Sequence, residues 1–285
     1  MRSLVSIHPR AILRMRLYRS FCSVYLLAVH IGRQCAVRRR LFVACLALLG
    51  VTGVAQSRFD DIGKISPSGP DWARGGRLLF IGDSITDMKW GRNEADRNHY
   101  LGHSYVFLIA ARLQTEYPKA EYEFFNRGKS GNTVGELRER WLKDAVGMKP
   151  DVLSILIGVN DVGRACRAGK MVDLGRWEAD YRWILDASRK ANPDLKIVLL
   201  DPFVLPVGRL QGEAAWEAWS GECTKLRAII KRLANEYQAI HLLTQEVFDR
   251  ASERSDASHW IWDGVHPLPQ GHELIARRWI KTVWR

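Results

Sequence analysis

The stretch Arg77–Asp87, with the sequence RLLFIGDSITD, decides the fold of this 285-residue chain. It opens with the short apolar run RLLFI, which is typical of a strand buried on both faces of a sheet. Gly82 then permits a tight turn, and the polar residues after it, Ser84 among them, suit the beginning of a helix. A buried strand that leads directly into a helix is the first part of a βαβ unit.

Strand and helix patterns continue to alternate from this stretch to the C-terminus. Four more strands are expected at residues 122–126, 151–157, 196–201 and 239–243. Helices are expected at residues 104–117, 133–143, 174–191, 214–237 with an interruption around Ser220-Gly221, and 270–284. This alternation predicts an α/β fold, in which helices cover both faces of a parallel sheet. No linker interrupts it, so residues 77–285 are expected to form one domain after a polar approach segment at 56–76.

The net charge of +12 belongs mostly to the first 55 residues. They contain nine arginines and no acidic residue. The rest of the chain contains the other 34 basic residues and all 31 acidic residues. The remaining balance of only +3 argues against the basic footprint of a nucleic-acid-binding domain. The content of 47% hydrophobic and 26% charged residues is that of a globular protein and excludes a disordered chain.

Residues 1–55 are interpreted as a leader that contains a secretory signal peptide at 37–55. A basic segment, Arg38-Arg39-Arg40, precedes the apolar run Leu41–Val51, and small residues follow at the −3 and −1 positions of a cleavage site after Ala55. The sequence therefore predicts an exported protein, periplasmic or secreted, whose translation begins at Val37. The uncharged run that ends at Ala55 has 15 residues, which is short for a membrane span, and an uncleaved N-terminal anchor is the alternative.

Ser84 lies where a parallel sheet collects its reactive groups. In such sheets, the residues that directly follow the strands meet at one edge. At a helix N-terminus, the oxygen of Ser84 has surroundings that favour negative charge, as a nucleophile requires. The more ordinary role of a serine at this place is to cap the helix.

Three further segments carry groups that acyl transfer needs. The glycines of the segment 126–133 let backbone N–H groups point into a cleft, and Asn160 adds a side-chain N–H, both suited to stabilising an oxyanion. Near the C-terminus, Asp263 precedes His266 by three residues. A serine hydroxyl needs a base such as histidine, and the imidazole needs an acceptor that fixes its tautomer. Taken singly, each has an ordinary alternative: a turn, an Asx-turn or a structural histidine.

Taken together and in order, these segments resemble the four motif blocks of the SGNH (GDSL) hydrolases: Gly-Asp-Ser-Ile-Thr (82–86), Ser-Gly-Asn-Thr (130–133), Gly-Val-Asn-Asp (158–161) and Asp-Gly-Val-His (263–266). The resemblance implies a flavodoxin-like, three-layer α/β/α sandwich. It also implies Ser84 as nucleophile, His266 as general base and then acid, and Asp263 as the residue that orients the histidine. The implied oxyanion hole consists of the Ser84 backbone N–H, Gly131 and Asn160.

Other segments resemble the branch of this family that contains acetylxylan esterases, among them Leu-Gly-His-Ser-Tyr-Val (101–106) and the Leu-x-x-Arg-Trp of Leu137–Trp141. The expected function is that of an exported serine esterase that hydrolyses short-chain acyl esters, acetyl esters first among them, on carbohydrate. A lysophospholipase or thioesterase is one alternative and would need a long apolar groove. A carbohydrate-binding surface protein without catalysis is another.

Three residues are candidates for substrate contact. Arg164 follows Asp161 by three residues and is expected near the mouth of the pocket, although it is equally suited to the surface. Trp90 and Trp262 flank motif blocks, and their rings suit stacking on sugars, but tryptophan packs cores more often than it binds ligands.

The cysteines predict neither a metal site nor a defined disulfide. No Cys/His spacing typical of a metal site is present, and the mechanism needs no cofactor. Cys166 and Cys223 are the two cysteines outside the leader. An exported compartment permits a bond between them, but the sequence leaves that bond open.

Overall fold

The centre of the domain is a sheet of five parallel strands. In the computed structural model, which describes residues 75–284, the strands are β1 (Arg77–Gly82), β2 (Glu123–Gly128), β3 (Val152–Leu156), β4 (Lys196–Leu200) and β5 (Ile240–Leu242). They lie in the order β2-β1-β3-β4-β5, and all neighbours are parallel. This is the flavodoxin-like order, with its switch point between β1 and β3.

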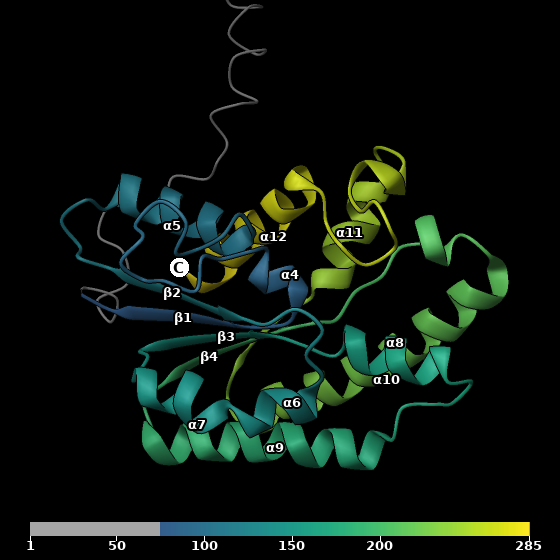
Figure 1. Cartoon of the computed structure of the whole chain (residues 1–285), viewed down its shortest axis with the longest axis horizontal. Coiled ribbons are helices and arrows are strands. Elements are labelled where there is room, and N and C mark those ends of the chain that lie inside the picture. The colour runs from purple at the N-terminus through teal and green to yellow at the C-terminus, as the bar shows by residue number, and fades with distance from the viewer. Residues whose placement is uncertain (1–74, 285) are drawn as a thin grey trace, which may run out of the picture. The chain divides into compact units, whose positions relative to one another are not determined.

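Helices cover both faces of the sheet, so the domain has three layers (Figure 1). One layer contains α4 (Ser84–Asp87), α5 (Tyr105–Glu116), α11 (Thr244–Ser252) and α12 (Pro269–Val283). The other contains α6 (Val134–Glu139), α7 (Trp141–Asp144), α8 (Val159–Arg167), α9 (Leu174–Ala191) and α10 (Glu213–Glu236). Within residues 75–284, three short 3₁₀ helices lie in the connections: η2 (Val146–Met148), η3 (Gly208–Leu210) and η4 (Ala257–His259). The predicted α/β/α sandwich is confirmed.

The apolar runs that predict β1, β3 and β4 are buried on both faces of the sheet. In β1, Phe80 is inaccessible to solvent, and its ring lies against Tyr105 of α5 and Trp279 of α12. Burial of a side chain of this size stabilises the fold by about 2–3 kcal/mol. The indole N–H of Trp279 donates to Ser154 Oγ in β3 at 2.8 Å, which satisfies a buried polar group. The first strand is thus held beneath the last helix.

The carboxyl ends of β1 and β2 hold α4 in place. A Cβ atom on Gly128 would lie 2.3 Å from the backbone nitrogen of Asp87, so only glycine permits α4 to approach β2 this closely. The fully buried Asn126 donates to the carbonyl of Thr86 at 2.8 Å and accepts from the Gly128 N–H at 2.8 Å. Ser84, the first residue of α4, is therefore fixed at the end of the sheet.

The helices differ from the sequence-based expectation in three respects. The helix expected at 133–143 divides into α6 and α7 at Arg140, whose guanidinium group donates to the carbonyls of Gly82 and Arg127. The interruption expected around Gly221 is wrong: α10 continues through it, because Gly221 has open space beside it while the opposite side of the helix is buried. The helices α8 and α11 occupy segments for which no helix is expected from the sequence.

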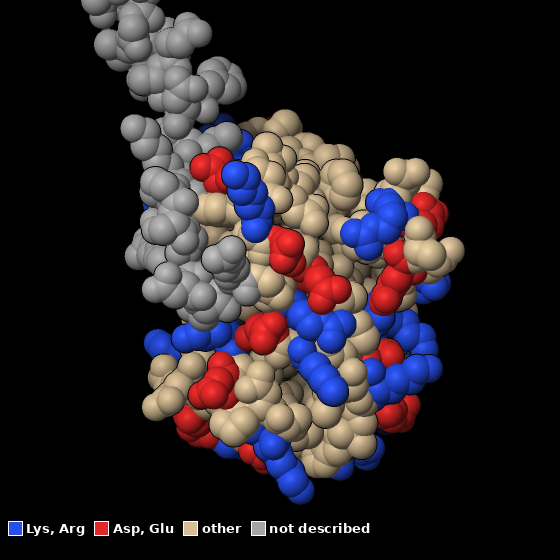
Figure 2. Space-filling model, turned by 90° about the vertical axis from the view of Figure 1, so that its left-hand side faces the viewer, with Lys and Arg blue, Asp and Glu red and all other residues tan. Residues whose placement is uncertain are grey.

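The structure of residues 75–284 also gives information on membrane-spanning helices, on the thiols and on the surface charge. Within residues 75–284, no helix is both long enough and apolar enough to cross a membrane. Cys166 on α8 and Cys223 on α10 are free thiols, although the two helices pack together. On the face seen in Figure 2, basic and acidic side chains are interspersed. The predicted signal peptide at 37–55 lies outside the described residues.

Candidate active site

Ser84 is the first residue of α4, directly after β1, and its hydroxyl is not used to cap the helix. The N-cap is Asp83, whose Oδ1 accepts from the Ile85 N–H at 3.0 Å. Ser84 Oγ instead lies 2.8 Å from His266 Nε2. The hydrogen bond joins residues 182 positions apart in the sequence, and it brings the first and the last motif block together.

Asp263 fixes both the ring and the backbone of His266. Its Oδ2 lies 2.8 Å from His266 Nδ1, and its Oδ1 accepts from the backbone N–H groups of Val265 and His266, at 3.0 and 2.7 Å. Asp263 is 5% exposed, so its carboxylate depends on these bonds. A carboxylate at Nδ1 selects the tautomer that carries its proton there, which leaves the lone pair of Nε2 to accept from the Ser84 hydroxyl.

The surroundings of His266 keep its imidazole neutral at neutral pH. Burial lowers the pKa of His266 below its ordinary value, and the nearby Arg209 guanidinium acts in the same direction, whereas the Asp83 carboxyl opposes both. Arg209 lies on η3 and donates to Asp263, through Nη2 to Oδ2 and through Nε to the backbone carbonyl at 3.2 Å. A neutral imidazole is the form that accepts a proton.

Three N–H groups of the motif blocks keep a hydrogen without a protein acceptor within residues 75–284. The backbone N–H groups of Ser84 and Gly131 donate to no protein acceptor within residues 75–284. The side-chain amide of Asn160, on α8, donates one hydrogen to the carbonyl of Asn132 at 3.1 Å and keeps the other free. These are the three groups that the sequence comparison with SGNH hydrolases singles out.

Asp83 and Asp161 place two further carboxyl groups in this region. Burial raises the pKa of Asp83 to about 7, against the opposing effects of the Ile85 N–H and His266. Its Oδ2 has no hydrogen-bond partner. Loss of hydration likewise raises the pKa of Asp161 to about 7, although both its oxygens accept from the Val134 N–H at 3.2 Å. Burial is the main cause of both raised pKa values.

The candidate substrate contacts lie in different surroundings. Trp262 is 63% exposed and directly precedes Asp263. Trp90 donates its indole N–H to the carbonyl of Gly128 at 2.9 Å, and the guanidinium groups of Arg92 and Arg127 lie over its ring.

The guanidinium group of Arg164 forms hydrogen bonds with a backbone carbonyl and a carboxylate of the protein. Its Nη2 donates to the carbonyl of Gly131 at 2.9 Å and to the Glu136 carboxylate. The sequence predicts a capping box of Thr133 and Glu136, and the structure confirms it at the start of α6. The contact of Glu136 with Arg164 and the role of Arg209 were not predicted, because no sequence signal indicates the partner of either arginine.

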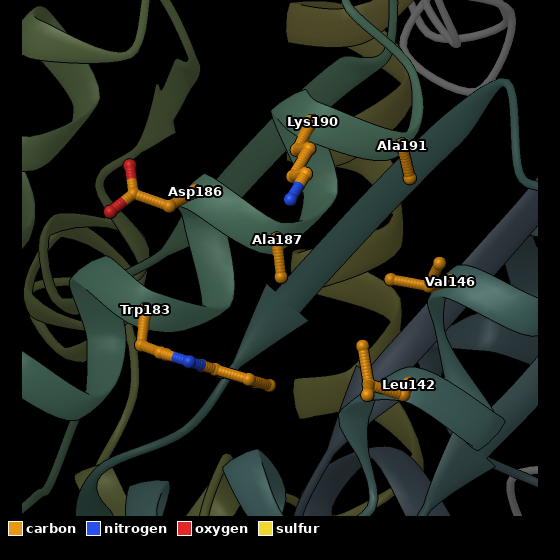
Figure 3. A pocket seen from close by; sticks show the side chains of 7 residues that line it. All are labelled: Leu142, Val146, Trp183, Asp186, Ala187, Lys190 and Ala191. Carbon is orange, nitrogen blue, oxygen red and sulfur yellow. The ribbon is translucent and has the colours of Figure 1, made fainter.

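A hollow of about 580 Å³ lies elsewhere, between α7, η2 and α9 (Figure 3). Leu142, Val146, Trp183 and Ala187 give it largely apolar walls, and none of the four motif blocks lines it. The chemistry therefore identifies the candidate site at Ser84 and not this hollow. Among the described residues, no group of three His, Cys, Asp or Glu side chains is arranged to hold a metal ion.

Comparison with known proteins decides the family. The model of the GDSL-like lipase/acylhydrolase family matches residues 80–274. The chain belongs to this family. It is 34% identical over 215 residues to an acetylxylan esterase from Geobacillus stearothermophilus. The aligned region covers 73% of this chain and 94% of that esterase.

Solved structures of family members share the fold. A GDSL-like lipase from Parabacteroides merdae superimposes with a TM-score of 0.68 at 34% identity, over 73% of this chain and 95% of that one. The acetylxylan esterase from Geobacillus stearothermophilus superimposes with a TM-score of 0.65 at 31% identity, over 75% and 96% of the two chains. The predicted family is confirmed, and the chain is a serine esterase that acts on carboxylic ester bonds.

Proposed function

We propose that this GDSL hydrolase is an exported esterase that removes short acyl groups, acetyl first among them, from carbohydrate. The observation that carries the mechanism is the line of two 2.8 Å contacts from Ser84 Oγ to His266 Nε2 and from His266 Nδ1 to Asp263 Oδ2. The likeness to an acetylxylan esterase supports the substrate class.

In the first half of the proposed reaction, Ser84 Oγ attacks the carbonyl carbon of the ester while His266 Nε2 takes the hydroxyl proton. Asp263 stabilises the imidazolium that forms. The oxygen of the tetrahedral intermediate accepts from the Ser84 N–H, the Gly131 N–H and the free amide hydrogen of Asn160. When the intermediate collapses, the bond between the acyl carbon and the sugar oxygen breaks, the imidazolium of His266 protonates that oxygen, the sugar leaves with a free hydroxyl, and the acyl group stays on Ser84.

In the second half, water repeats the sequence of proton transfers. His266 takes a proton from water, the resulting hydroxide attacks the acyl carbon, and the same three donors hold the oxyanion. The proton returns to Ser84 Oγ as the carboxylic acid leaves. The lowered pKa of His266 favours both halves, since each begins with the neutral imidazole.

Variants of the related acetylxylan esterase support these roles. Catalytic mutants of that enzyme replace a serine, an aspartate and a histidine with alanine, and its aspartate and histidine lie three positions apart. Asp263 and His266 have the same spacing in this chain.

Trp262 is proposed as a platform for the sugar. Trp262 is 63% exposed and directly precedes Asp263, so a sugar ring that stacks on it lies next to the proposed catalytic groups. Trp262→Ala is expected to raise KM for an acetylated xylo-oligosaccharide while leaving kcat/KM for p-nitrophenyl acetate within about twofold of the wild type. An equal loss on both esters would contradict a role in sugar binding. A sugar contact for Trp90 stays a prediction.

Export is proposed from the leader alone. The basic Arg38-Arg39-Arg40 and the apolar Leu41–Val51 precede small residues at Gly53 and Ala55, as in a cleaved signal peptide. The hydrolase domain then begins near Arg77, just ahead of the region matched by the family model. N-terminal sequencing of the protein recovered outside the cytoplasm is expected to begin at Gln56, and a retained leader would favour an N-terminal anchor.

The experiment that tests the function compares four esters by kcat/KM: acetylated xylan, acetylated pectin, a lysophospholipid and an acyl thioester. Acetylated carbohydrate is expected to be preferred. Ser84→Ala and His266→Ala are each expected to abolish nearly all turnover and to leave the thermal midpoint close to that of the wild type, because nucleophile and base act as one unit. A folded Ser84→Ala protein with activity near that of the wild type would overturn the assignment.

A further inference from the structure

Two side chains of α8 hold the loop between β2 and α6, residues 129–133. Asn160 Nδ2 donates to the carbonyl of Asn132 at 3.1 Å. One turn later, Arg164 Nη2 donates to the carbonyl of Gly131 at 2.9 Å. Successive peptide groups of the loop that carries the Gly131 N–H are therefore held from the same helix.

Gly131 is the point at which this loop needs support. Its φ is +84°, in the region that favours glycine, and glycine rotates about its backbone bonds more freely than other residues. The residue before it is fixed, because the N–H and hydroxyl of Ser130 both donate to Asp87 Oδ2, at 2.9 and 2.7 Å. Arg164 fixes the peptide group that follows. The direction of the Gly131 N–H thus depends on restraints at both flanks.

Glu136 on α6 keeps the guanidinium group of Arg164 in place. Its two carboxylate oxygens lie 3.0 and 2.8 Å from Arg164 Nη2, and Oε2 also accepts from the Thr133 N–H at 2.9 Å in a capping box. The side chain of Arg164 is 52% exposed, and an ion pair this accessible to solvent contributes little to stability. The arrangement therefore affects the position of the loop more than the stability of the fold.

We infer that Arg164 is a positioning residue, which keeps the Gly131 N–H directed at the oxyanion. The inference rests on the proposed function, in which this N–H is one of three donors. A donor to the oxyanion acts only near the transition state, so misdirecting it lowers kcat and leaves KM unchanged. A residue that contacts substrate, as the sequence suggested for Arg164, would raise KM instead.

The test measures kcat and KM of the full chain on p-nitrophenyl acetate, together with the thermal midpoint. Arg164→Met is expected to lower kcat about tenfold, a fraction of the 10²–10³-fold typical when one donor is lost, with KM within about twofold of the wild type. Arg164→Lys retains a cation that reaches the Gly131 carbonyl and is expected to recover part of the loss. Arg167→Met, one turn further along α8, is the matched control and is expected to leave both constants unchanged.

A double-mutant cycle with Glu136→Gln identifies the route of the effect. Glutamine preserves the capping box but not the ion pair, so Glu136→Gln alone is expected to lower kcat less than Arg164→Met. If Glu136 acts through Arg164, the double variant is no slower than Arg164→Met by itself, whereas additive losses would overturn that route.

The results separate this inference from the proposed function. A raised KM with unchanged kcat in Arg164→Met, or no change in either constant, would overturn the positioning role while leaving the esterase intact. A wild-type protein that does not hydrolyse the ester would overturn the proposed function and this inference with it.

Discussion

Replacing Asp83 by asparagine is expected to stabilise the protein at alkaline pH and to have little effect at pH 4. Asp83 is 1% exposed, and only one of its oxygens has a hydrogen-bond partner, the Ile85 N–H at 3.0 Å. Burial accordingly raises its pKa to about 7. Asparagine keeps the acceptor for the Ile85 N–H and carries no charge at any pH.

The sign and size of the effect follow from proton linkage. In the unfolded chain, the pKa of Asp83 returns to about 3.9, so between pH 4 and 7 the folded state holds a proton that the unfolded state has lost. The free energy of unfolding therefore falls as the pH rises through this window, and it is constant above it. At about 1.4 kcal/mol for each pKa unit, the difference of about three units gives a penalty of up to about 4 kcal/mol at pH 8.

Urea unfolding at pH 4 and pH 8 measures this penalty directly. Asp83→Asn is expected to exceed the wild type by up to about 4 kcal/mol at pH 8, equivalent to a rise in thermal midpoint of up to about 10 °C, and to match it at pH 4. The exposed Asp194→Asn is the control and is expected to stay within about 0.5 kcal/mol of the wild type at both pH values. Equal or lower stability of Asp83→Asn at pH 8 would refute the reasoning, since it would mean that the fold favours the ionised carboxylate.

Four further predictions concern catalysis. The value of kcat/KM is expected to rise with pH through the pKa of His266, which lies below its ordinary value. Arg209→Gln is expected to move that midpoint to higher pH, since it removes a positive charge that lowers this pKa, and an unchanged midpoint would contradict the assignment. Asn160→Ala is expected to lower kcat about 10²–10³-fold on p-nitrophenyl acetate, and a dominant effect on KM would make Asn160 a substrate-binding residue. Activity is expected to fall from acetyl to octanoyl p-nitrophenyl esters, since each methylene gains about 0.8 kcal/mol only where a groove buries it, and a maximum at octanoyl would favour lipid hydrolysis.

Features set by local sequence pattern were predictable, and features set by packing were not. The sequence places all five strands within two residues, and β1, β3 and β4 within one, because a strand buried on both faces leaves a continuous apolar signature. The helix α8 was missed because its first turn, Val159-Asn160-Asp161, is polar enough to suit a turn. The division at Arg140 was missed because it follows from contacts with two strand ends that lie far away in the sequence.

The same distinction applies to the site. The order of the motif blocks indicated Ser84, Asp263 and His266, and the fold brings these side chains within hydrogen-bond distance. The burial of Asp83 and the contact of Arg209 with Asp263 depend on tertiary structure. No spacing of residues in the sequence therefore predicts them. For Arg164, the sequence suggested a place near the pocket but not the carbonyl to which it donates.

Because 182 residues separate Ser84 from His266, the recovery of esterase activity reports when the whole domain has folded. Contacts between residues far apart in sequence carry the largest loop-closure cost and dominate the slow steps of folding. A refolding chain that has formed β1 and its neighbours still lacks the contact between Ser84 and His266 until the segment before α12 docks beside them. Recovery of ester hydrolysis after dilution from denaturant therefore reports the closing of the whole domain, whereas circular dichroism reports the earlier growth of helices.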